Sequence, residues 1–238
     1  MTQNEPNPKA IARTIRSHIE ENGLYRINRG DKRGVNIDLM TEVWTTETLT
    51  SIGNWGIPIE KLLSSKEEGP ITPDKVHKDV RDPSRGGSRL DFRSDSILTV
   101  LEDNYERWNE NRGEDKNPTQ QAGFAAGSLN RFFNELTDGT PFLGNLGEGM
   151  AFGRVVGEYP EYRPNGQTVS YQGKDVSKGH VFVREVEWAR NEYGEVIQIP
   201  YDQLPNKLGP VPQTVTEVND ATGLYEQANV IEFLSNYD

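Results

Sequence analysis

Two apolar, β-branched runs joined by a long glycine-rich connection constrain the fold of this chain more than any other feature. Residues 149–157 read GMAFGRVVG and residues 181–188 read VFVREVEW. Runs of this kind, bounded by Gly, Pro and Asn, predict two β-strands. The connection is too long for a tight turn, and long loops on a strand scaffold often carry function. Tyr159, Tyr162 and Trp188 at the strand ends can line a pocket for a flat ligand or pack in the core, and the residues alone favour the core.

Several other segments carry the apolar spacing of helices or of short strands. Residues 122–136 predict a helix whose buried side is Phe124, Leu129, Phe132, Phe133 and Leu136. Further helices are expected over residues 9–22, which Gly23 would end, and over residues 94–111 and 219–235. Strand-like runs lie within residues 35–55, 137–145, 196–204 and 205–218. This mixture predicts an α+β fold.

The composition narrows the classes of function. The chain has 238 residues, no cysteine and a formal net charge of −11. Without cysteine there is no disulfide framework, no thiolate zinc site and no cysteine nucleophile. Residues 1–10 lack the apolar core of a signal peptide, and no apolar run approaches the roughly 18 residues that a membrane helix needs. We therefore expect a cytoplasmic protein with no membrane partner. Its acidity argues against broad attraction to nucleic acid but permits a locally basic face.

Two segments are locally basic. Residues 9–33 contain seven Lys or Arg against three Asp or Glu, a local net charge of 7 − 3 = +4. Residues 66–93 are poor in apolar side chains and place Arg81, Arg85, Arg89 and Arg93 at four-residue intervals. Both segments suit contact with phosphates, and both also suit a solvated surface, which the sequence slightly favours for residues 9–33. The sequence leaves these alternatives open.

The common catalytic motifs do not occur in the sequence. It has no GKS or GKT phosphate loop, no Gly-x-Ser-x-Gly element and only three histidines, which form no cluster. Glu185 and Glu187 alternate with apolar residues, which is typical of the polar face of a strand. His77 has no partner at a metal-ligand spacing. We therefore expect a protein that is not an enzyme and that uses no metal and no cofactor.

Six motifs follow one another in an informative order. They are IGNWG (52–56), a helix ending in RFFNELTDGT (131–140), AFGRVVGEYPEY (151–162), HVFVREVEWA (180–189), IPYDQLPNKL (199–208) and PVPQTVTEV (210–218). This order resembles the EVE-like domains of the PUA/YTH superfamily that are fused to McrB-type and Mrr-type modification-dependent restriction systems. Two departures occur: Asn54 splits the family's IGW, and Asp138-Gly139 stands where the family has Gly-Asp. The resemblance covers roughly residues 36–218.

The resemblance implies a small, curved β-barrel flanked by helices that reads a modified base, usually flipped from the stack. Carried over by position, the base pocket would contain Trp55, Asn54, Tyr159, Tyr162 and Trp188. Trp55 and one tyrosine would stack on the base and Asn54 would contact its edge, whereas Trp188 is a third wall or a core residue. Phosphate contacts would come from Arg85, Arg89, Arg154 and Arg163. The expected function is a non-catalytic module for methylated DNA rather than RNA, in a defence system whose nuclease or motor part is a separate subunit.

The alternative is a structural or protein-interaction protein that keeps the barrel and has no base pocket. The overall negative charge favours this alternative, and burial of Trp55 and Tyr159 would support it. An open pocket rimmed by arginine would support the base reader. By domain, we expect a tail plus N-terminal helix over residues 1–35 and an EVE/PUA-like domain over 36–218 with a long loop at 66–93. A C-terminal helix would follow over 219–238.

Overall fold

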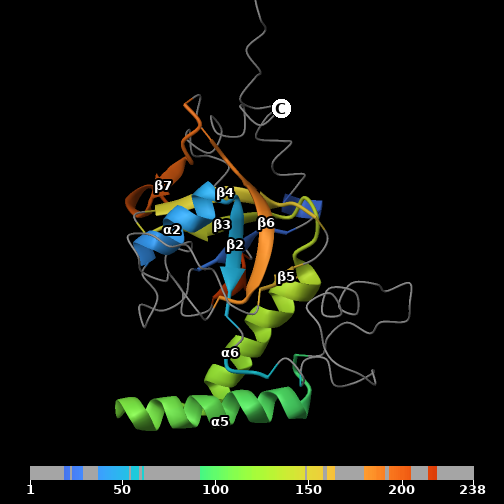
Figure 1. The fold of residues 1–238 in the computed structure, drawn as a ribbon, viewed down its shortest axis with the longest axis vertical. Helices are drawn as coiled ribbons and strands as arrows, with labels where there is room; N and C mark the ends of the chain where they lie inside the picture. The colour runs from blue at the N-terminus through green and yellow to red at the C-terminus, as the bar shows by residue number, and fades with distance from the viewer. Residues whose placement is uncertain are drawn as a thin grey trace, which may run out of the picture.

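A computed structural model shows a mixed α+β fold in which a strongly curled sheet forms a half-barrel and helices flank it (Figure 1). The structure describes residues 19–21, 23–28, 37–53, 55–58, 61, 92–147, 149–157, 160–163, 180–190, 193–204 and 214–218. The α+β class expected from the sequence is confirmed. The helices expected over 9–22 and 219–235 and the loop at 66–93 lie wholly or largely outside the described residues.

The sheet has eight strands in the described part of the chain. They are β1 (Tyr25–Ile27), β2 (Leu49–Ile52), β3 (Pro141–Asn145), β4 (Gly149–Val155), β5 (Glu161–Tyr162), β6 (Phe182–Trp188), β7 (Gln198–Pro200) and β8 (Val215–Glu217). The main order is β2-β6-β4-β3-β1-β8, and in addition β5 pairs with β6 and β7 pairs with β4. The strand pair predicted within residues 149–188 is confirmed as β4 and β6, which run antiparallel.

Strand β6 is central to the curled sheet because it pairs with other strands along both of its edges. On one edge it pairs with β2, and Ile52 lies opposite Phe182. On the other edge it pairs with β4 near Trp188 and with β5 near its start, where Tyr162 also lies opposite Phe182. The ends of β2 and β5 are therefore brought to the same end of the sheet, although more than a hundred residues separate Ile52 from Tyr162 in the chain.

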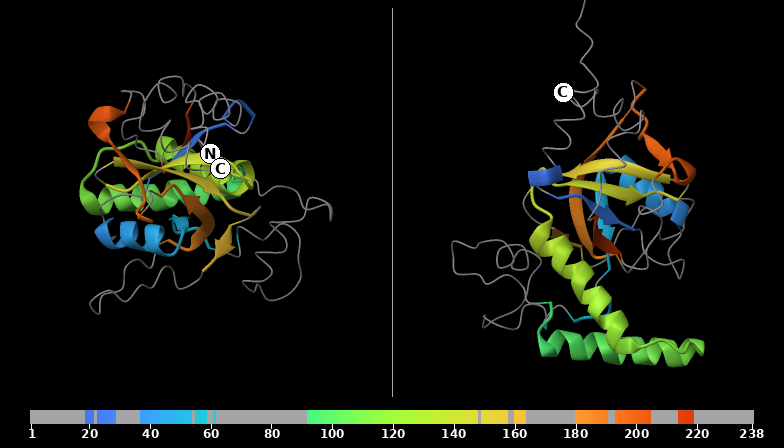
Figure 2. Two further views of the ribbon diagram at one scale, coloured as in Figure 1. Left: turned by 90° about the horizontal axis from the view of Figure 1, so that it is seen from above. Right: turned by 180° about the vertical axis from the view of Figure 1, so that it is seen from behind.

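Two long helices extend from one end of the half-barrel. Helix α5 (Asp95–Arg112) ends at Gly113, whose left-handed backbone at φ 63° is suited to glycine. Helix α6 (Pro118–Asn130) begins at Asn117, whose side chain accepts a hydrogen bond from the Gln120 N–H. Seen from behind in Figure 2, α6 runs from the half-barrel to α5, which lies across its far end. A shorter helix, α2 (Ile37–Thr46), leads into β2.

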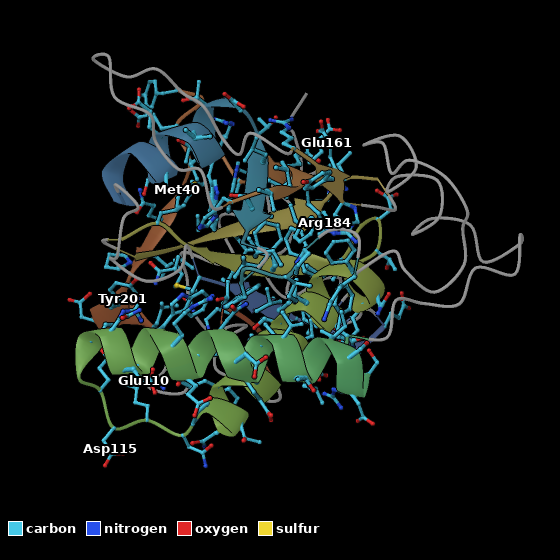
Figure 3. The ribbon with its side chains drawn as sticks, turned by 60° about the horizontal axis from the view of Figure 1, so that its bottom comes forward. Met40, Glu110, Asp115, Glu161, Arg184 and Tyr201 are labelled. Atoms are coloured by element: carbon cyan, nitrogen blue, oxygen red, sulfur yellow. The ribbon has the colours of Figure 1, made fainter. Side chains whose placement is uncertain are left out.

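A π-helical turn, η2 (Arg131–Glu135), joins α6 to the sheet. Its widened backbone bonds from Leu136 N–H to the Arg131 carbonyl at 2.9 Å. The buried Arg184 of β6 donates from Nε to the carbonyl oxygen of Phe132 at 2.8 Å. A π-turn displaces the usual helical bonds, and this guanidinium supplies a donor to a backbone carbonyl of the turn. Figure 3 shows Arg184 within the body of the molecule.

In the interior of the half-barrel, Trp188 packs closely against Gly144. The ring of Trp188 lies so close to Gly144 of β3 that a Cβ there would be 2.4 Å from Trp188 Cη2. Trp188 also stacks on Trp44 of α2, with ring centroids 6.4 Å apart, and meets the edge of Phe142 at 5.2 Å. Glycine at this position lets the strand pass beneath the indole, which fills the core between α2 and β3.

The structure differs from the sequence prediction at Phe124. Phe124 is 38% exposed, because it lies two residues, or about 200° of helical rotation, from both Ala122 and Ala126 on the buried face of α6. The other four predicted inward residues, Leu129, Phe132, Phe133 and Leu136, are buried as expected. The sheet also begins before residue 36, because β1 pairs with β3 and with β8. Residues 25–27 are thus part of the sheet.

Candidate functional site

Two of the predicted base-stacking residues follow or lie on strands that end at the same end of the half-barrel. Ile52, the last residue of β2, and Tyr162 of β5 lie on either side of Phe182, and neighbouring strands are about 4.8 Å apart. Trp55 follows Ile52 by three residues. We call this region, defined by Trp55, Tyr162 and Phe182, the aromatic end of the half-barrel. Trp55 and Tyr162 are both partly exposed, and both pack against the main core.

The backbone at Trp55 has an unusual conformation. Its φ is 48°, and among the described residues only Thr48 shares a positive φ without being glycine. A bulky residue in the left-handed region is a genuine outlier. Gly56 follows at φ 74°. The carbonyl oxygen of Trp55 accepts a hydrogen bond from Asn104 Nδ2 of α5 at 3.0 Å, so the turn after β2 is tied to that helix.

A row of aromatic rings leads inward from Tyr162. The ring of Tyr162 is 5.8 Å from that of Phe182, which in turn is 4.8 Å from Phe133 of the π-turn. Phe133 is 5.1 Å from Phe92, which precedes α5. Aromatic pairs at these separations add to the stability that burial alone gives. The partly exposed Tyr162 therefore packs against the first of three buried aromatic rings. Sequence reasoning did not connect these four rings, because they come from separate parts of the chain.

Trp188 lies in the core and away from the aromatic end. It is 3% exposed, and its indole N–H donates to the carbonyl oxygen of Trp44 at 2.7 Å. It follows Phe182 by six residues of the same strand, which is roughly 20 Å. Of the two roles that the sequence left open for Trp188, core packing is the one that the structure shows.

Two of the candidate phosphate-binding arginines have carboxylate partners. Arg154 of β4 contacts the Glu187 carboxylate of β6 at 2.5 Å. Arg163, next to β5, contacts Glu161 at 2.9 Å and Glu47 at 3.6 Å. Exposed ion pairs contribute only about 0.2–1 kcal/mol, so a phosphate can compete for either arginine at small cost. Of these two, Arg163 adjoins the aromatic end. The remaining candidates, Asn54, Tyr159, Arg85 and Arg89, lie outside the described residues.

No family model, curated protein or solved structure matches this chain. The assignment of a function therefore depends on the arrangement of the chain's own residues.

A buried histidine that the sequence analysis did not single out lies beside the aromatic end. His180 precedes β6, and its Nδ1 is 3.0 Å from Ser51 Oγ and 3.2 Å from the Ser51 carbonyl oxygen. Ser51 Oγ also accepts a hydrogen bond from the Trp44 indole N–H at 2.9 Å. Burial lowers the pKa of His180 to about 4, so the imidazole is neutral at pH 7 and links β2, β6 and α2. No local pattern in the sequence indicates this role, because Ser51 lies 129 residues from His180 in the chain.

The described part of the chain contains neither a metal-binding cluster nor a membrane-spanning helix. No group of three or more His, Cys, Asp or Glu side chains within it is arranged to hold a metal ion. None of the helices in the described ranges combines the length and the apolar character needed to cross a bilayer. The aromatic end has two partly exposed rings, those of Trp55 and Tyr162, and Arg163 follows Tyr162 in the chain.

Proposed function

We propose that this chain is a non-catalytic nucleic-acid-binding module with a PUA-like barrel, and that it holds a methylated base at the aromatic end. The observation that carries the proposal is the left-handed backbone of Trp55 at φ 48°. Strained conformations of bulky residues persist where the surrounding structure enforces them, and they cluster at ligand sites. Here the strain fixes a large aromatic residue at the end of the sheet that also presents Tyr162.

The chemistry of a base suits this pair of residues. Stacking of a base on an aromatic ring is worth about 1–3 kcal/mol, and it tolerates any base because each has a π-face. Extruding a base from a duplex costs a few kcal/mol. Stacking on two rings offsets most of this cost, and hydrogen bonds to the base edge and contact with the methyl group supply the rest. We propose DNA rather than RNA as the nucleic acid, with cutting or translocation carried out by a separate subunit.

A second candidate function, protein interaction without a base pocket, has its own supporting observation. The exposed side of α5 is acidic: Asp95, Asp103, Glu106 and Glu110 are exposed along it, against Arg107 and Arg112. Figure 3 shows Glu110 on this helix. An acidic surface next to the proposed site repels a phosphate backbone, which favours a protein partner for that face.

Binding of fluorescent DNA duplexes distinguishes the two functions. The duplexes carry methylated cytosine, hydroxymethylated cytosine, methylated adenine or no modification, and each is measured at low and at high salt. The variant Trp55→Ala removes the proposed stacking ring. The matched control is Tyr193→Ala, because Tyr193 is an aromatic residue that is 79% exposed in the turn between β6 and β7.

The base reader predicts tighter binding to one modified duplex, lost in Trp55→Ala and retained in Tyr193→Ala. Binding that ignores the modification and disappears with salt reports phosphate contact alone and contradicts base reading. The absence of binding at both salt concentrations favours the protein-interaction function.

A further inference from the structure

Asn104 is a buried polar residue on a helix that is otherwise largely exposed. It is 7% exposed, and both ends of its amide are used. Its Nδ2 donates to the carbonyl oxygen of Trp55 at 3.0 Å, and its Oδ1 accepts from an Nη of Arg107 at 2.6 Å. A flipped amide would place its NH₂ against the guanidinium and its oxygen against the carbonyl. Arg107 therefore fixes the orientation in which Asn104 holds Trp55.

The shape of the chain next to Trp55 depends on the same asparagine. Gly56 has φ 74°, and a Cβ added there would lie 2.9 Å from Asn104 Nδ2 and 3.7 Å from Trp108 Cζ2. Glycine at this position gives Asn104 room to approach the backbone. Figure 1 shows the segment after β2 leaving the half-barrel towards α5. One hydrogen bond thus links the helix to Trp55, the first of two successive residues in left-handed conformation.

We propose that Asn104, oriented by Arg107, is a positioning residue that sets the direction in which Trp55 presents its ring to the ligand. The identity of the ligand as a base rests on the proposed function, whereas the positioning of Trp55 does not. If Asn104 acts in this way, removing its amide donor changes the environment of the Trp55 ring and weakens stacking on the ligand, although Asn104 itself does not contact the ligand. An amide that served only to stabilise α5 would leave the Trp55 environment unchanged.

The chain offers a matched control on the same helix. Asn109 is 5% exposed, and its Nδ2 donates to the Lys116 carbonyl at 3.1 Å and to Gln121 Oε1 at 2.7 Å. Its bonds therefore hold the turn between α5 and α6 and not the turn at Trp55. The test variant Asn104→Asp keeps the size of the side chain and an acceptor for Arg107 but removes the donor to Trp55. The control Asn109→Asp makes the same chemical change five residues further along α5.

The first readout needs no ligand. The protein has four tryptophans, so labelling with fluorotryptophan gives four fluorine NMR signals, and Trp55→Phe assigns that of Trp55. We expect Asn104→Asp to shift or broaden the Trp55 signal and Asn109→Asp to leave it in place. The positioning role is overturned if Asn104→Asp leaves the Trp55 signal unchanged, or if Asn109→Asp alters it equally.

The second readout is affinity for the duplex of the panel above that the wild-type protein binds most tightly. We expect Asn104→Asp to bind this duplex with about tenfold lower affinity, which is equivalent to part of one stacking contact. Asn109→Asp should bind as the wild type does. In a Trp55→Ala background, Asn104→Asp should cost nothing further, because its effect passes through the ring. A shifted Trp55 signal in a protein that binds none of the duplexes supports the positioning role and contradicts the proposed function. Undiminished affinity in Asn104→Asp overturns the link to binding.

Discussion

Arg184 Nε lies 2.8 Å from the backbone carbonyl oxygen of Phe132, and this bond joins the central strand of the half-barrel to the π-turn that ends α6. A second donor of the same guanidinium reaches the Phe133 carbonyl at 3.4 Å. The guanidinium also lies 5.7 Å from the Phe132 ring, within the range of a cation–π contact. One buried side chain of the sheet therefore supplies two donors to the backbone of the π-turn.

Replacing this arginine should destabilise the protein. In Arg184→Met the buried carbonyl of Phe132 loses its charged donor, and such bonds are worth about 1.5–3 kcal/mol. We expect the free energy of unfolding, measured by chemical denaturation, to fall by about 2 kcal/mol or more. Arg112→Met, at the exposed end of α5, should change it by less than about 0.5 kcal/mol. Equal stability of the two variants would contradict this role of Arg184.

Substitution of two glycines with a left-handed backbone distinguishes the stability cost of backbone strain from that of a steric contact near Trp55. Gly56→Ala and Gly113→Ala both place alanine at a positive φ, 74° and 63°, but only the first brings a Cβ close to a neighbour, at 2.9 Å from Asn104 Nδ2. Each substitution should cost about 1 kcal/mol or more from strain. Gly56→Ala should lose further stability because Asn104 must move. Thermal denaturation of both variants measures the difference, and equal losses would show that Asn104 can shift freely.

The sequence predicted the parts of this molecule whose signals are local. The strands β4 and β6, the helix α5 and the turn at Gly23 follow from periodicity and from glycine at their ends, and the structure confirms them. It wrongly placed Phe124 on the buried face of α6, because the small residues Ala122, Ala125 and Ala126 form that face and carry a weak hydrophobic signal. Nor did it reveal Asn104 or His180, since their roles come from partners 49 and 129 residues away. Such pairings form only when the folded chain brings distant segments together.

His180 should make stability depend on pH. Burial lowers its pKa from 6.5 to about 4, so as pH falls the unfolded chain takes up a proton near 6.5 while the folded protein does not. The contribution of His180 to stability is therefore complete above about pH 6.5 and is lost as pH falls towards about 4, amounting to about 3 kcal/mol.

The variant His180→Asn tests this dependence, because an amide keeps a hydrogen-bonding group near Ser51 and does not titrate. Chemical denaturation across this pH range should show a shallower fall for the variant than for the wild type. Carboxylates titrate equally in both proteins and cancel in the comparison. Parallel curves would show that the folded protein accepts a proton on His180 as readily as the unfolded chain does.

Two glutamates test which arginine faces the phosphates of a bound nucleic acid. Glu161→Gln weakens the hold on Arg163 at the aromatic end, where the contact is 2.9 Å, whereas Glu187→Gln weakens the hold on Arg154, which lies on β4. Removing a negative charge anywhere raises general attraction to DNA, so the two variants share that effect. If the base sits at the aromatic end, Glu161→Gln should bind the preferred duplex several-fold more tightly than Glu187→Gln does. One added phosphate contact should also steepen the salt dependence of log K by about one. Titrations of both variants over a range of salt concentrations give both quantities. Equal affinities and equal slopes would place the phosphates away from Arg163 and would move the proposed site away from the aromatic end.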